Sequence, residues 1–250
     1  MIQNDALQAF FDRKSVRSFL DKAVPQEIKE LIIDAGIAAP SAGNQQLYTI
    51  IVLEEQALKE KLALLCDNQP FIATAPFVLV LLADCRRWLD CYHYAGLDPR
   101  RPGLGDMLLA CEDAVIAAQN MVMAAHFLGL GSCYIGDILE NQEEVAALLH
   151  LDSWVVPATM LVFGYPTQQA AERNKPKRPP REYLVRKNYY SALSEPELRR
   201  LFNDLSPGRD FNQYMTAFCK RKYLSDFAQE MNRSVLCFSA PFTKDQERTE

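Results

Sequence analysis

The sequence predicts a sandwich in which helices flank one mixed β-sheet, of the α+β or α/β class. Strand patterns alternate with helical patterns over the first two thirds of the chain, one strand is apolar throughout, and one long helix lacks a polar face. Packing helices against both faces of a sheet would bury the apolar strand and the long helix in one core, and it matches the alternation of strands and helices. The chain has 250 residues, of which 49% are hydrophobic and 24% charged, so it can build a core of that size.

The first part of the chain alternates clear helical and strand patterns. The segment 25–40 begins with a proline, which the first turn of a helix tolerates, and then repeats apolar residues at helical spacing. The segment 77–83 (Phe-Val-Leu-Val-Leu-Leu-Ala) is nearly all apolar, which indicates a strand buried on both faces. From these patterns we expect helices at residues 4–13, 25–40 and 57–66, and strands at 48–53 and 77–83.

The second part contains an irregular segment, a long apolar helix and a basic extension. Residues 85–105 have the least regular pattern, and we interpret them as a surface insertion or a lid. Residues 106–128 predict a long helix without a polar face, which indicates burial in the core or against a partner subunit. Downstream we expect strands at 133–135 and 155–163, and helices at 141–149, 195–202 and 213–231. We divide the chain into a core over 1–170 and a basic, helical extension of the same domain over 171–250.

The bulk properties exclude several classes of protein. A net charge of -5 and a pI near 5.4 argue against nucleic-acid binding. The N-terminus lacks a basic segment followed by an apolar one, and the longest apolar run, 76–83, is far below the ~20 residues of a membrane helix. The seven cysteines have no Cys-x-x-Cys spacing and the three histidines are isolated, so we expect no metal site and a reducing, cytoplasmic location.

Several catalytic motifs are also missing. The sequence has no Gly-x-Gly-x-x-Gly fingerprint, no P-loop, no His-Glu-x-x-His and no Gly-x-Ser-x-Gly. If the protein is an enzyme, a cofactor therefore supplies its chemistry.

A cluster of cations follows the first predicted helix. Arg13, Lys14, Ser15 and Arg17 place three positive charges and one hydroxyl within five residues. Arginine binds phosphate bidentately, lysine adds a compact charge, and serine adds a hydrogen bond, so the stretch suits a phosphomonoester. The alternative is an exposed, solvated run of charge.

Three further segments have compositions suited to a flat, charged ligand. Residues 39–46 (Ala-Pro-Ser-Ala-Gly-Asn-Gln-Gln) allow close approach to the backbone and offer groups that match an isoalloxazine edge, or form a plain turn. Residues 129–136 (Gly-Leu-Gly-Ser-Cys-Tyr-Ile-Gly) leave room for a ring, or form a helix C-cap. After Gly164-Tyr165-Pro166, residues 175–180 present cations on an extended proline-rich backbone, or form a basic linker.

In this order, the four segments resemble the FMN-dependent nitroreductase family, and more closely its larger, NADPH-preferring flavin and nitro reductases. The resemblance covers about residues 10–180. It implies an α+β sandwich with a central mixed sheet flanked by helices, in an intertwined homodimer with one FMN at each of two subunit interfaces. It also implies that NAD(P)H gives hydride to FMN, which then reduces a small nitro, quinone or flavin-type acceptor by ping-pong exchange, with no catalytic side chain.

The resemblance assigns residues to the cofactor site. Ligands of the FMN phosphate and pyrimidine are Arg13, Lys14, Ser15, Arg17 and Arg178, with Lys177 or Lys175 beside Arg178. Residues contributed by the other subunit are Pro40, Ser41, Ala42 and Asn44. Residues beside the flavin ring are Gln69, Tyr134, Ile135 and Gly136.

Two departures and two alternatives accompany this assignment. The family's usual proline is replaced by Leu47, and its usual glycine after Gly136 by Asp137, an acid whose effect on the flavin is open. The first alternative is another flavoenzyme on the same fold, such as a reductive dehalogenase or a flavin-fragmenting enzyme. The second is a non-catalytic protein that only binds FMN or phosphate. The physiological acceptor and the preference between NADPH and NADH stay open.

Overall fold

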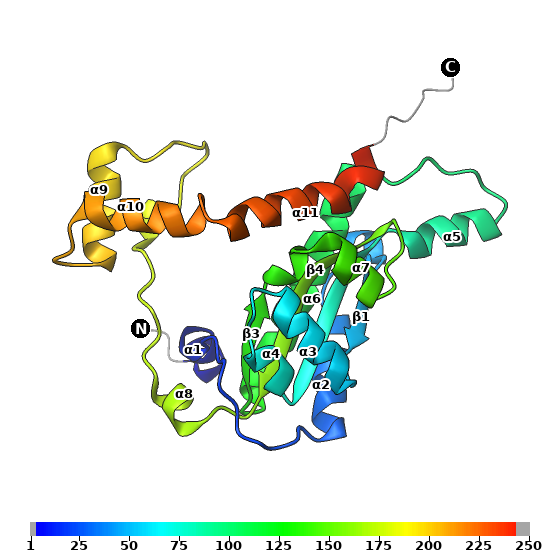
Figure 1. Cartoon of the computed structure of the whole chain (residues 1–250), viewed down its shortest axis with the longest axis horizontal. Coiled ribbons are helices and arrows are strands. Elements are labelled where there is room, and N and C mark those ends of the chain that lie inside the picture. The colour runs from blue at the N-terminus through cyan, green and yellow to red at the C-terminus, as the bar shows by residue number, and fades with distance from the viewer. Residues whose placement is uncertain (1–3, 244–250) are drawn as a thin grey trace. The chain divides into compact units, whose positions relative to one another are not determined.

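The computed structural model describes residues 4–243 and contains a four-stranded sheet between two layers of helices (Figure 1). The strands are β1 (Tyr48–Val52), β2 (Phe77–Asp84), β3 (Gly131–Ile135) and β4 (Val155–Gly164). Their order in space is β1-β2-β4-β3, so β1 and β3 are the edge strands. The α+β class and the central sheet flanked by helices are confirmed.

The pairing of the strands differs from the mixed sheet that we predicted. All three strand pairs are antiparallel, and the parallel contact is an isolated bridge between Ser15 and Ser132. The physical reason is the position of β4, which inserts between β2 and β3. These two strands run in the same direction but are not neighbours, so they do not pair.

Helices cover both faces of the sheet. One layer contains α3 (Gln56–Leu65), α4 (Phe71–Thr74), α7 (Gln142–Leu148) and the end of α11 (Asp226–Thr243). The other contains α2 (Gln26–Ile37) and α6 (Leu104–Phe127). The shorter elements are α1 (Asp5–Asp12), η1 (Ala42–Asn44), α5 (Arg86–Tyr94), η2 (Asp137–Leu139) and α8 (Gln168–Glu172).

Strand β2 divides its side chains between the two layers. Every residue of β2 is buried, which confirms the strand predicted from its continuous apolar run. Val78 and Val80 belong to the cluster that includes α3, whereas Leu79 and Leu81 pack against α6. This alternation is the period of two that a strand imposes on its side chains.

Two predicted elements are wrong in detail. Residues 85–105 are not irregular throughout, because α5 occupies 86–94; its charged and aromatic composition hides an amphipathic pattern. The single helix predicted at 213–231 is two helices, α10 (Phe211–Lys222) and α11. The break falls at 223–225, where the Ser225 hydroxyl accepts a hydrogen bond from Ala228 N at 3.3 Å and so begins a new helix.

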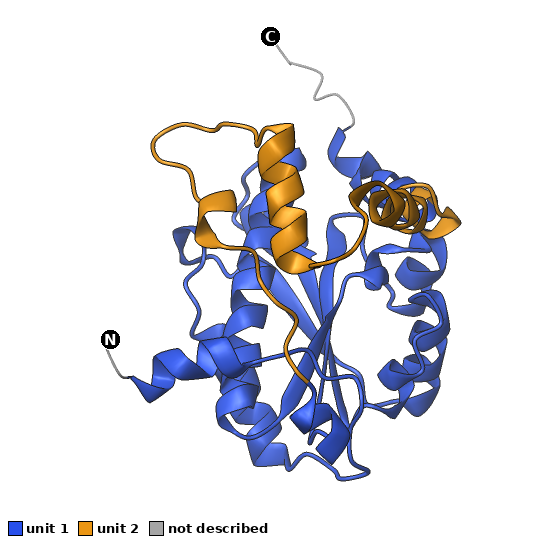
Figure 2. Cartoon of the chain, turned by 90° about the vertical axis from the view of Figure 1, so that its left-hand side faces the viewer, with its two compact units in different colours: residues 1–173, 230–250 blue, residues 174–229 orange. Residues whose placement is uncertain are grey.

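The chain forms two compact units, coloured separately in Figure 2. Unit 1 comprises residues 1–173 and 230–250 and contains the sheet. Unit 2, residues 174–229, contains η3 (Arg181–Tyr183), α9 (Glu195–Leu205), α10 and the start of α11. Its own small core is aromatic: the ring of Phe202 lies 5.3 Å from that of Phe211 and 5.0 Å from that of Tyr214.

Helix α6 has one buried face and one exposed face. By length and composition it is long and apolar enough to cross a membrane, but it packs along the sheet, with Ala114, Ala118 and Met121 in the core, and we interpret it as a core helix. Its opposite face exposes Leu108, Val115 and Ile116. The expected burial against the core is therefore found on one side of α6, and none of the residues that the structure describes covers the other side.

Candidate functional site

The segment with the predicted phosphate ligands runs along the outer edge of β3. Helix α1 ends at Arg13, and the chain then extends so that Val16 N donates to Ser132 O at 2.9 Å. A Cβ atom at Gly131 would lie 2.6 Å from the Val16 side chain, so this close approach requires glycine there. The sheet edge thereby positions Ser15 and Arg17 next to residues 132–134.

Arg13 and Arg17 place two positive charges at this edge. Arg13 Nη1 is buried and has no hydrogen-bond partner among the described residues. Arg17 lies with its guanidinium 5.8 Å from the ring centroid of Phe71. Both cations act on the thiol of Cys133. Burial raises the pKa of this thiol, and Arg17, Ser15 and Arg13 lower it by a smaller amount. A buried donor without a partner is costly unless a ligand satisfies it, so the arrangement fits a phosphate group.

A cavity opens beside Arg17. Its volume is about 520 Å³, and its walls include Ser15, Arg17, Gln169 and Arg173. Lys14 has another contact, since its ammonium group donates to the carbonyl oxygens of Ala171 and of Arg173, the latter at 2.5 Å. Lys14 therefore joins the N-terminal loop to the end of α8, next to the cavity.

The predicted ring-side residues lie on the same side of unit 1. Tyr134 follows on β3, and its hydroxyl donates to Gln119 Oε1 of α6 at 3.2 Å. Burial raises the pKa of Tyr134 to about 12, against the opposing charge of Arg13, so the phenol stays neutral at physiological pH. Ile135 is buried and Gly136 begins the turn into η2, where nothing would lie within 4 Å of an added Cβ atom. This backbone is therefore open to a flat ligand.

Gln69 is held against that turn by a specific contact. Asp67 and Asn68 both have positive φ (55° and 50°), a conformation that Asp and Asn adopt more readily than most residues. The resulting bend places Gln69 so that its Nε2 donates to Asp137 Oδ2 at 2.6 Å and to Cys66 O at 2.9 Å. Asp137 thus fixes the Gln69 amide, which is a role that the sequence did not reveal.

The loop that carries Pro40, Ser41, Ala42 and Asn44 lies at the opposite edge of the sheet. It leads into β1, and two strands separate β1 from β3. With strand spacings near 4.8 Å, this distance is roughly 14 Å, so one chain does not bring the two predicted halves together.

A buried carboxylate holds this second loop. Asp113 of α6 accepts hydrogen bonds from Ala42 N at 2.9 Å and from Leu47 N at 3.1 Å, and it is 2% exposed. The Ser41 hydroxyl accepts from Gln46 N at 2.9 Å. Sequence reasoning missed Asp113 because its partners are 66 and 71 residues away in the chain. The one feature of the sequence that pointed to it is that an acidic residue occurs within an apolar helix.

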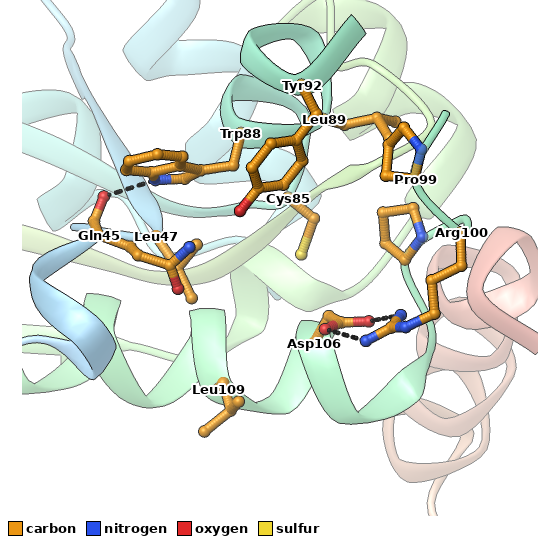
Figure 3. A pocket seen from close by; sticks show the side chains of 11 residues that line it. Gln45, Leu47, Cys85, Trp88, Leu89, Tyr92, Pro99, Arg100, Asp106 and Leu109 are labelled. Atoms are coloured by element: carbon orange, nitrogen blue, oxygen red, sulfur yellow. Dashed lines mark hydrogen bonds and ion pairs between the residues drawn. The ribbon is translucent and has the colours of Figure 1, made fainter. Parts of the chain in front are cut away.

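Helix α5 packs on the same loop and bounds a second cavity, of about 240 Å³ (Figure 3). Trp88 Nε1 donates to Gln45 O at 2.9 Å, and Arg87 donates to Gln46 O and Tyr48 O at 3.0 and 2.7 Å. At the far end, Arg100 and Asp106 form an ion pair of 2.6 Å. The predicted lid segment is therefore attached near its start to this loop and near its end to the first turn of α6.

The remaining predicted ligands belong to unit 2. Lys177 and Arg178 are exposed within it, in an extended stretch before η3. Their assignment to the phosphate stays a prediction.

The chain is similar in sequence and in fold to known proteins. The profile of the nitroreductase family matches residues 11–165. The chain is 35% identical over 179 residues to an FMN reductase (NAD(P)H) of Bacillus subtilis, covering 70% of this chain and 71% of that protein. It is 35% identical over 194 residues to an oxygen-insensitive NADPH nitroreductase of Salmonella typhimurium, covering 77% and 78%. The solved structure of B. megaterium NfrA2 has a TM-score of 0.76 at 28% identity, covering 93% and 98% of the two chains.

Replacing Asp113 by alanine should destabilise unit 1. The change leaves the amides of Ala42 and Leu47 without their acceptor in a buried position, at a cost of about 2–4 kcal/mol. Urea denaturation measures the difference, and Glu112→Gln, at an exposed position of the same helix, is the matched control. Equal stability of the two variants would show that the carboxylate does not hold the loop.

Proposed function

The chain belongs to the nitroreductase family, and on this premise we propose that it is an FMN-dependent oxidoreductase that uses NAD(P)H to reduce nitro, quinone or flavin-type acceptors. The observation that carries the proposal is Arg13 Nη1, which is buried and has no partner within the described part of the chain, at the β3 edge with Arg17 and Tyr134. A cavity of about 520 Å³, lined by Arg17, opens at the same edge. The FMN reductase and the NADPH nitroreductase to which the chain is similar support the same activity.

The described residues divide the work of binding FMN. Arg13, Ser15 and Arg17 hold the phosphate and the negatively charged edge of the ring, since guanidinium groups match phosphate oxygens in geometry and charge. The backbone at Tyr134–Gly136 packs against the flavin, and the Gln69 amide hydrogen-bonds its polar edge. Lys177 and Arg178 add positive charge at the phosphate.

When bound, FMN accepts hydride from NAD(P)H and passes the reducing equivalents to the acceptor. The protein side chains bind, orient and exclude water. The Tyr134 phenol is neutral, so the charge at the β3 edge comes from Arg13 and Arg17. These cations favour a negatively charged ligand by Coulomb attraction. We assign no side chain as acid or base, and we place the reaction in the cytoplasm, where NAD(P)H is available.

We further propose that the protein acts as a homodimer. The loop with Pro40, Ser41, Ala42 and Asn44 lies at the other edge of the sheet, so the same loop of a second copy completes the site at β3. Two apolar surfaces are available for such an interface. They are the face of α1 with Leu7 and Phe10, and the outer face of α6 with Leu108, Val115 and Ile116.

An absorbance spectrum of the purified protein, before and after anaerobic NADPH, tests the activity. We expect a flavin spectrum that bleaches with NADPH and recovers when a quinone or nitro compound is added. A bound flavin that NADPH does not bleach would favour a non-catalytic flavin-binding protein. A colourless protein that also fails to bind added FMN would refute the proposal.

Removing a cation from the β3 edge should weaken FMN binding. Arg17→Ala deletes one charge-assisted contact, so we expect the dissociation constant for FMN to rise about tenfold or more. Quenching of FMN fluorescence measures it. Lys61→Ala, which removes an exposed cation from α3, serves as the control and should bind like the unmodified protein. Full retention of FMN by Arg17→Ala after dialysis would remove Arg17 from the site.

A charge on the outer face of α6 should separate the two subunits. In Ile116→Asp the carboxylate would lie at a desolvated interface, so we expect a monomer that has lost most of its bound FMN. Light scattering coupled to gel filtration gives the mass. Leu64→Asp places the same charge on the exposed side of α3 and should stay dimeric. A dimeric Ile116→Asp protein would move the interface elsewhere.

A further inference from the structure

Glu140 is a buried acid that the proposed reaction does not use. It follows η2, the short helix that begins at Asp137 directly after Gly136. The residue is 5% exposed, and its Oε1 is buried without a hydrogen-bond partner among the described residues. In the ionised carboxylate this oxygen would carry negative charge with neither water nor a donor, which is unfavourable.

The groups that face Glu140 are themselves acidic. They are Asp137 on η2, Asp67 at the end of α3, and Glu230 on α11. The thiol of Cys66 lies in the same region, and burial with Asp137 and Glu140 raises its pKa, so it is neutral. The Glu230 carboxylate is itself paired with a cation, Arg233, which donates to Glu230 at 2.7 Å and to Glu143 at 2.8 Å.

These surroundings keep a proton on Glu140. Burial, followed by repulsion from Asp137, Asp67 and Glu230, raises the pKa of Glu140 to about 7. The side chain is therefore protonated in mildly acidic solution and ionised in mildly basic solution.

Ionisation of Glu140 acts on the flavin side through Asp137. Asp137 Oδ2 accepts the 2.6 Å hydrogen bond from Gln69 Nε2, and the main chain joins Asp137 to Glu140 through one turn, with Glu140 N donating to Asp137 O at 3.0 Å. A second negative charge on this turn repels the Asp137 carboxylate and favours its displacement from Gln69. This displacement weakens the contact that orients Gln69.

We propose that Glu140 is a positioning residue: with its proton it keeps Asp137 and Gln69 in place beside the flavin, and without its proton it loosens FMN binding. This inference rests on the proposed function, because it places Gln69 at the ring. Glu140 itself does not touch the cofactor.

The dissociation constant for FMN at pH 6 and pH 8 tests the proposal. We expect the constant of the unmodified protein to rise about fivefold or more over this range, a typical coupling between sites. Glu140→Gln, an isostere of the protonated acid, should keep tight binding at pH 8. Glu144→Gln makes the same change at an exposed position of α7 and should follow the unmodified protein, which controls for the titration of FMN itself.

Unfolding of the FMN-free protein gives a second readout. Between the ordinary pKa of glutamate and about 7, the folded state holds a proton that the unfolded state has lost, so stability falls as the pH rises. The gain in urea midpoint from Glu140→Gln should therefore be larger at pH 8 than at pH 5. An equal gain in urea midpoint at both pH values would refute the inference that Glu140 holds a proton in the folded protein.

The outcomes separate the two proposals. FMN binding with the same pH dependence in the unmodified protein and in Glu140→Gln would overturn the positioning role and leave the proposed function intact. A protein that binds no FMN at either pH would overturn the proposed function, and with it the role of Glu140 toward the flavin.

Discussion

Burial of strand β2 on both faces is the constraint on which the rest of unit 1 depends. A strand whose every side chain is buried requires a helical layer on each side of the sheet. The layer with α2 and α6 covers one set of alternate side chains, and the layer with α3, α4, α7 and α11 covers the other. Because β2 and β4 are central, β1 and β3 become the edges, and both candidate loops attach to those edges.

This arrangement explains why the candidate site divides into two halves. The cations at residues 13–17 extend the sheet beyond β3, whereas residues 40–44 enter it at β1. Helix α6 connects the halves, since Asp113 holds the loop before β1 and Gln119 accepts from Tyr134 on β3. The outer face of the same helix is apolar and exposed, so one element supports both edges and offers the surface on which a second copy would pack.

Buried polar groups distinguish structural from functional positions. Asp113 has two backbone donors and serves the fold. Arg13, beside β3, and Glu140, directly after η2, each leave a buried atom without a partner among residues 4–243. Such atoms are unfavourable in a protein that binds nothing, because they lose water without gaining a hydrogen bond. We infer that an anion satisfies Arg13 and a proton satisfies Glu140.

The sequence by itself determined the elements whose patterns are local. The continuous apolar run of β2, the helical spacing in α2 and the absence of a polar face in α6 each follow from residues within one segment, and their boundaries agree with the structure to within about three residues. The cation cluster was equally visible, because its members are adjacent. Helix α5 was missed because its charged and aromatic composition hides its amphipathic pattern. The break between α10 and α11 was missed because Tyr223 and Leu224 continue the apolar composition across it.

Only the tertiary structure decided which distant residues act together. It paired Asp113 with amides 66 and 71 residues away, Gln69 with Asp137, and Glu140 with acids from three other positions in the chain. It also decided that β4 separates β2 from β3 and that the two loops lie at opposite edges. Hydrogen bonds and burial depend on distance in space, and the order of residues determines that distance only after the sheet and its helical layers have packed.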